Sequence, residues 1–130
     1  MKKLLVLIYM IAISVNAEPR LYFIEPNNFD VITDRTFKVQ FGLEGFGVAP
    51  AGYNIENTGH HHLLINTFLP EDLTKPIPAD ELHIHFGLGQ TETYITLEPG
   101  EHTLRLVLGN YVHIPHEKPI ISEEIQILVL

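Results

Sequence analysis

The 130-residue sequence contains no cysteine and no tryptophan. The lack of cysteine excludes disulfides, thiolate metal ligands and cysteine nucleophiles at the same time. Basic residues are few: the sequence has eight Lys and Arg and 16 Asp and Glu, which gives a formal net charge of −8. Nucleic-acid binders need a basic surface that releases counterions from phosphates, so we expect no nucleic acid among the partners. A chain of this length has room for one domain.

The N-terminal residues have the pattern of a secretory signal peptide. Met1–Lys3 is a short positive region, residues 4–14 form an apolar run, and residues 15–17 resemble a small-residue cleavage site. The apolar run is shorter than the roughly 20 residues that span a membrane. The alternative is an uncleaved N-terminal anchor. We expect residues 1–17 to be removed, residues 18–130 to form one periplasmic domain, and the mature protein to have no membrane span.

Beyond residue 17, apolar side chains alternate with a period of two rather than recurring every three or four residues. Turn residues interrupt this alternation about every ten residues. The pattern is typical of an all-β, immunoglobulin-like antiparallel β-sandwich of about seven strands. The expected strands are residues 21–24, 36–43, 60–68, 82–86, 93–97, 102–108 and 122–130.

His102 follows a Pro-Gly pair in the segment Leu97-x-Pro99-Gly100-x-His102. Immunoglobulin-like domains have a corner before strand F at which a tyrosine bonds back to the backbone. His102 occupies the corresponding position here and shares a strand face with the apolar residues that follow it. We therefore predict a structural role for His102.

Histidine is the residue type in excess, since its eight copies equal all Lys and Arg together. Side chains alternate between the faces of a strand, so His60 and His62 point one way and His61 points the other. His61 shares its face with the apolar residues two and four positions later, and we expect it to face the core. His83 and His85 alternate with apolar residues and are expected to face outward.

These histidines lie on segments that an immunoglobulin-like topology brings together. If consecutive strands pair antiparallel, the start of 60–68 lies beside the end of 82–86, with opposed Cβ atoms about 5 Å apart. The loop at 113–116 is expected at the same end of the sandwich. The sequence therefore predicts one metal site with six candidate ligands: His60, His62, His83, His85, His113 and His116.

The donor set indicates which metal to expect. Imidazole nitrogen suits zinc and copper, whereas calcium and magnesium prefer the carboxylate oxygens that an all-histidine site lacks. Both methionines, Met1 and Met10, lie in the expected signal peptide, so the mature protein has no thioether for a copper(I) site. We expect a copper or zinc ion as the cofactor.

Two other functions remain open at this point. Histidines also brace loops by donating to carbonyls, and the protein would then be a structural or binding module whose loop at Gly87–Glu92 contacts a partner, such as another periplasmic protein. A histidine-bound metal with an open position can instead activate water, as in a hydrolase. No nucleophile elbow surrounds Ser122 and no phosphate-binding glycine loop is present, so we expect a binding protein and not an enzyme.

Several strings carry a resemblance to known sequences: GHHHLLI at 59–65, HIHFGLGQTE at 83–92, PGEHTL at 99–104, HIPH at 113–116, and Ser122. Together they resemble the secreted bacterial family "domain of unknown function 4399" over about residues 23–130. That family has no assigned activity, so the resemblance implies a secreted protein but no substrate.

The C-terminal part, residues 97–130, is also similar to periplasmic copper-resistance β-sandwich proteins. The shared features are the Pro-Gly corner, the strand after it and a histidine-bearing loop before the last strand. This likeness implies a fold and a compartment more than it implies a metal.

Overall fold

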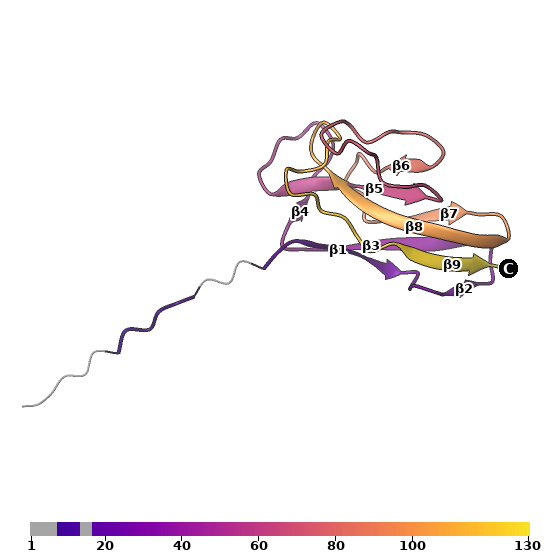
Figure 1. Ribbon diagram of the computed structural model, residues 1–130, viewed down its shortest axis with the longest axis horizontal. Helices are drawn as coiled ribbons and strands as arrows, with labels where there is room; N and C mark the ends of the chain where they lie inside the picture. The colour runs from indigo at the N-terminus through magenta and orange to yellow at the C-terminus, as the bar shows by residue number, and fades with distance from the viewer. Residues whose placement is uncertain (1–7, 14–16) are drawn as a thin grey trace, which may run out of the picture.

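The computed structural model describes residues 8–13 and 17–130. Most of the expected signal peptide lies outside these residues. Of its described part, residues 8–13 and residue 17, the stretch 8–13 extends away from the folded body without regular structure (Figure 1). In the described ranges, no helix is long and apolar enough to cross a membrane. All regular secondary structure that the structure describes is β, which confirms the all-β prediction.

The strands form two sheets (Figure 1). The first has the order β1-β3-β7, and the second has the order β2-β9-β8-β5-β4, with β6 also paired to β5. In the described chain the strands are β1 (Arg20–Glu25), β2 (Val31–Ile32), β3 (Thr36–Glu44), β4 (Gly47–Val48), β5 (Thr58–Ile65), β6 (His83–His85), β7 (Glu92–Thr96), β8 (Gly100–Gly109) and β9 (Ile125–Val129).

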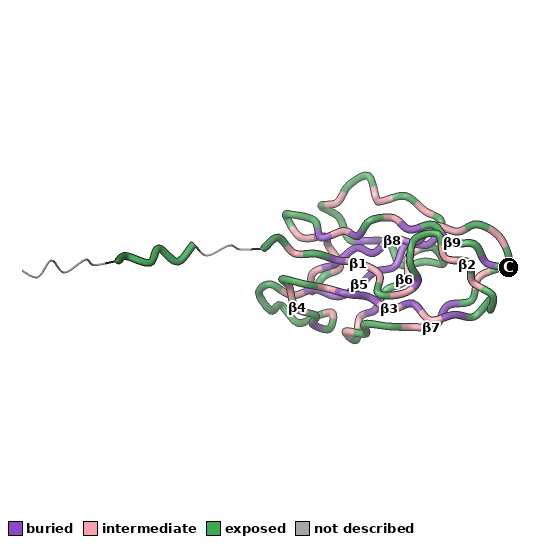
Figure 2. The backbone as a smooth tube through the Cα atoms, turned by 90° about the horizontal axis from the view of Figure 1, so that it is seen from below, coloured by how far each residue is buried: buried purple, intermediate pink, exposed green. Residues whose placement is uncertain are grey.

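One apolar core lies between the two sheets, and Figure 2 shows buried backbone on β3, β5 and β8. Alternate residues of both sheets point into it, as the period-two pattern predicts. Val39 of β3, Leu63 of β5 and Leu106 of β8 are fully buried there. The other buried members are Leu21, Phe37, Phe41, Ile65, Phe86, Ile95, Leu104, Leu108, Ile120, Ile125, Ile127 and Val129.

All seven expected strands are present, with shifted ends. The strand expected at 60–68 ends at Ile65, because Asn66 adopts a positive φ of 53° and its Oδ1 accepts a hydrogen bond from Thr103 N. The two-residue strands β2 and β4 were not predicted, since a two-residue segment is too short to show alternation. The immunoglobulin-like assignment stays a prediction.

His102 has the structural role predicted for it. Its Nε2 donates to the backbone oxygen of Glu98 at 2.7 Å, and its Nδ1 accepts from the Asn66 amide at 2.9 Å. Both ring nitrogens are therefore satisfied, and the ring ties the start of β8 to the end of β5.

His61 faces the core, as predicted. It is fully buried, and its ring centroid lies 5.0 Å from that of Phe41. Both of its ring nitrogens are buried without a hydrogen-bond partner among the described residues. Burial accordingly lowers the pKa of His61 to about 4, so the ring is neutral at pH 7.

The two histidines should respond oppositely to replacement by leucine. His61→Leu removes two unsatisfied buried nitrogens, and we expect it to raise the free energy of unfolding of the metal-free protein by about 1 kcal/mol. His102→Leu breaks two hydrogen bonds and should lower it by about 1–2 kcal/mol. Urea denaturation at pH 7 measures both, and a loss of stability in His61→Leu would contradict the unsatisfied state of its ring.

Candidate metal centre

Strand β5 is buried on both of its faces. His61 and Leu63 face the inter-sheet core, whereas His60 and His62 project from the opposite face. That face is not open to water, because loop residues cover it and leave the side chains of His60 and His62 at most 1% exposed. His60 and His62 therefore point away from His61, as predicted. They are nevertheless buried, although side chains on the outer face of a sheet are usually exposed.

A second, smaller apolar cluster lies on this face of β5. Leu64 of β5 and Val107 of β8 pack against Ile77, which belongs to the loop between β5 and β6. Leu69 of the same loop and Ile121 from the segment before β9 complete the cluster. Figure 1 shows the loop between β5 and β6 on the side of β5 that faces away from β3.

His85 reaches the cluster through strand pairing. β6 runs antiparallel to β5, with His62 opposite His85 and Leu64 opposite His83. This is the antiparallel neighbourhood that the sequence predicted. The register, however, brings only His85 beside His62.

His113 enters from the loop after β8 and has a positive φ of 68°. Such a conformation costs a non-glycine residue about 1–3 kcal/mol unless its surroundings hold it. Asn110 holds it here, since its Oδ1 accepts from the backbone nitrogens of Val112 and Ile114, and its carbonyl accepts from His113 N. The covering loop is attached at the same place, because Ile77 N donates to His113 O at 2.8 Å.

Four imidazoles therefore meet at one place. Each offers one ring nitrogen, and these four atoms all lie within 4.8 Å of one another. The ring centroids are 4.6–5.9 Å apart. We call this group the histidine cluster; its members are His60, His62, His85 and His113.

The cluster has the electrostatics of a neutral, partly desolvated donor set. Burial, followed by repulsion from neighbouring cluster histidines, lowers the pKa of His60 to about 4 and that of His62 to about 3. Burial and the proximity of His113 also lower the pKa of His85. At pH 7 these rings are unprotonated, which is the form in which imidazole binds a metal.

Two of the six candidate ligands lie outside the cluster. His83 pairs with Asp80 instead, its Nδ1 lying 2.7 Å from Oδ1, because the register places it opposite Leu64. His116 donates from Nε2 to the carbonyl of Thr58 at 2.9 Å and packs edge-on against Phe46. The structure therefore brings together four of the six residues and assigns the other two local bracing contacts.

Three residues that shape the cluster were not predicted from the sequence. A Cβ at Gly109 would lie 2.5 Å from Cε1 of His62, and one at Gly87 would lie 2.4 Å from Cε1 of His85. Both rings thus lie directly over glycine backbone. Asn110 is the third residue, and its position just before the HIPH loop, in a short segment rich in turn residues, was the available signal.

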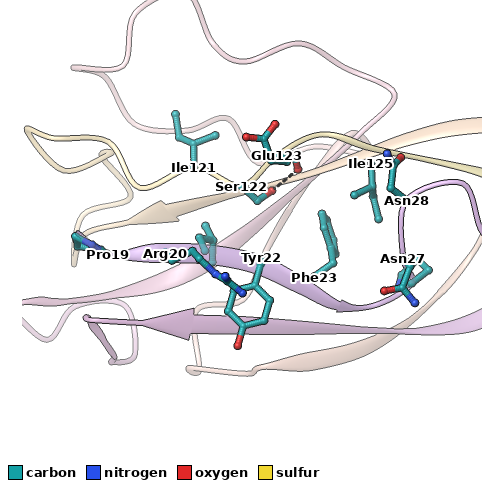
Figure 3. Close-up of a pocket in the computed structure, with 12 residues that line it drawn as sticks. Pro19, Arg20, Tyr22, Phe23, Asn27, Asn28, Ile121, Ser122, Glu123 and Ile125 are labelled. Atoms are coloured by element: carbon teal, nitrogen blue, oxygen red, sulfur yellow. Dashed lines mark hydrogen bonds between the residues drawn. The ribbon is translucent and has the colours of Figure 1, made fainter. Parts of the chain in front are cut away.

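A larger pocket, of about 410 Å³, lies between β1 and the segment Ile121–Ile125 (Figure 3). Its polar side chains include Ser122, whose Oγ donates to Glu123 O and accepts from Leu106 N, both at 2.8 Å. Asn28 Oδ1 accepts from Gln126 N. These groups are engaged in holding the chain together, and no histidine lines this pocket, so the histidine cluster is the better candidate site.

Comparison with known proteins identifies the family. The family described as domain of unknown function (DUF4399) matches residues 39–130, which is most of the chain. The chain belongs to this family. The DUF4399 match includes all four members of the histidine cluster. No curated protein matches the chain.

Among solved structures, the endo-β-1,4-mannanase from Thermotoga petrophila is similar to this DUF4399 protein, with a TM-score of 0.54 and 16% sequence identity. The similarity covers 90% of this chain but only 21% of the mannanase chain. At this identity the likeness concerns the fold alone.

The metal-free protein should lose stability in acid. His60, His61 and His62 stay neutral when folded but titrate near pH 6.5 when unfolded, so the unfolded state binds more protons below that pH. The contribution of these three rings to the free energy of unfolding is complete above pH 6.5 and is lost as the pH falls toward 4. The free energy of unfolding should then fall by up to about 4 kcal/mol per pH unit. Urea unfolding between pH 7 and 4.5 measures it. A free energy of unfolding that does not change with pH would contradict the neutral state of the three buried rings. His61→Leu removes one of these rings and should make the pH dependence less steep.

Asn110 offers a separate test of the loop that carries His113. Asn110→Ala removes an acceptor of two hydrogen bonds and should lower the free energy of unfolding by about 1–2 kcal/mol. Asn110→Asp keeps the oxygen and should stay within about 0.5 kcal/mol of the original protein. Equal effects of the two changes in thermal unfolding would show that the side-chain oxygen is not what holds the loop.

Proposed function

We propose that this protein binds a divalent transition metal, copper or zinc, through His60, His62, His85 and His113. The observation that carries the proposal is the convergence of four imidazole nitrogens within 4.8 Å of one another from three separate segments. Zinc–nitrogen bonds of 2.0–2.1 Å place tetrahedral ligand atoms about 3.3 Å apart. Small ring rotations would close the cluster to that spacing.

Hydrogen bonding favours this function over a bracing network. Among the described residues, one hydrogen bond joins cluster members, between His60 Nε2 and His113 Nδ1 at 3.0 Å. Nδ1 of His60 and Nδ1 of His62 are buried without a partner. His102, which does brace two strands, has both nitrogens bonded. A cluster that leaves so much hydrogen-bonding capacity unused is better suited to hold an ion.

The donor chemistry supports copper or zinc. The four donor atoms gathered in the described chain are all imidazole nitrogens, with no carboxylate among them. Neutral imidazole binds zinc and copper(II) well and binds calcium or magnesium poorly. A resident ion would also offset the desolvation of the buried His60 and His62 rings, because its binding energy adds to the stability of the folded state.

We infer a binding role rather than an enzymatic one, in an exported, periplasmic protein. The pocket beside the cluster is lined by three proposed metal ligands, His62, His85 and His113, and by Ile77 and Ala79, so no titratable side chain other than the ligands is left there to act as a general base. The compartment is inferred from the signal-like pattern of residues 1–17.

Calorimetric titration of the metal-free protein tests the proposal. We expect one saturable site per chain for copper(II) or zinc(II), tighter than about 10 µM, or roughly −7 kcal/mol. Absence of such a site for both ions would refute metal binding.

Matched asparagine variants test the ligand set. His113→Asn removes a cluster ligand and should weaken the metal affinity at least tenfold, about 1.4 kcal/mol or more. His83→Asn is the control, because the sequence suggests it as a ligand and the structure pairs it with Asp80. It should leave the affinity unchanged. Equal weakening in both variants would mean that the metal is not held by the cluster.

A further inference from the structure

A small pocket of about 100 Å³ opens beside the histidine cluster. His62, His85 and His113 line it, whereas His60 does not. The ring of His60 is fully buried and lies 4.7–5.0 Å from each of the other three rings. An ion held by the four nitrogens therefore has His60 behind it and the pocket in front of it.

The other residues that line the pocket are Ile77 and Ala79. Their side chains neither coordinate metals nor form hydrogen bonds. A molecule in the pocket would consequently be bound mainly by the ion itself. Since one water takes up about 30 Å³, the pocket has room for about three waters, or for a ligand of two to four heavy atoms.

The charge of the metal ion decides which ligands of this size are favoured. Four neutral imidazoles leave the full double charge on the ion, and no carboxylate belongs to the donor group found in the described residues. Uncompensated charge in a partly desolvated site is costly, and a bound anion reduces that cost. A negatively charged ligand is therefore favoured over a neutral one of equal size.

We propose that the ion, bound as in the proposed function on which this inference rests, takes a small monoanion of two to four heavy atoms from this pocket as a further ligand. The anion replaces water on the open side of the ion and leaves the four protein ligands in place. The pocket thus makes the site a receptor for small anions as well as for the metal.

Azide is a suitable probe because it is a linear monoanion of three heavy atoms. The protein is loaded with one equivalent of copper(II) and titrated with sodium azide. A saturable azide-to-copper charge-transfer band and a shifted electron paramagnetic resonance spectrum are expected, with one azide per copper. Benzoate, which is too large for the pocket, should neither shift the spectrum nor compete with azide. Effective competition by benzoate would overturn the proposal.

Filling the pocket tests its location. Ala79→Leu adds bulk at the pocket without replacing a ligand, so copper affinity should stay within about threefold while azide affinity falls at least about tenfold. Pro76→Leu places the same side chain in the same loop, at an exposed position outside the pocket, and should leave azide binding unchanged. Equal azide affinity in the two variants would overturn the proposal. If Ala79→Leu does not fold, the comparison of azide with benzoate on the original protein decides.

The design separates the two proposals. Copper binding without any response to azide would overturn the anion proposal and leave the metal function intact. Failure of copper and zinc to bind at all would overturn the metal function, and the anion proposal with it.

Discussion

The structure depends on the burial of β5 on both of its faces. Pairing with β8 and packing against β3 enclose His61 and Leu63, while the loops on the opposite side enclose His60, His62 and Leu64. A strand enclosed in this way is expected to be apolar throughout. Three consecutive histidines at its centre are therefore costly to bury, and the neutral state of their rings keeps that cost low.

The burial of these rings also favours metal binding by His60 and His62. Burial removes the competing proton, because a depressed pKa keeps imidazole in its metal-binding form. The same covering loops carry or hold the remaining ligands: the loop after β8 supplies His113, and the loop between β5 and β6 leads to His85 and is tied to His113 through Ile77. The elements that desolvate the site are thus the elements that complete it.

Much of the fold could be predicted because its signals are local. Alternation located seven strands, the Pro-Gly corner explained His102, and strand parity placed His61 in the core. Within the candidate site, the four cluster histidines were all among the six residues that the sequence selected. The two others, His83 and His116, lie outside the cluster because register and loop path, rather than proximity in sequence, decide which rings meet.

The sequence by itself determined the class of fold, the face of each histidine on its strand and the exclusion of thiolate ligands, since these follow from a two-residue period and from the absence of cysteine. Only the tertiary structure decided that the outer face of β5 is buried, that His62 lies opposite His85 and that Asn110 turns His113 toward them. These are contacts between segments distant in sequence. Their geometry is set by long-range pairing and loop packing, for which no local pattern codes.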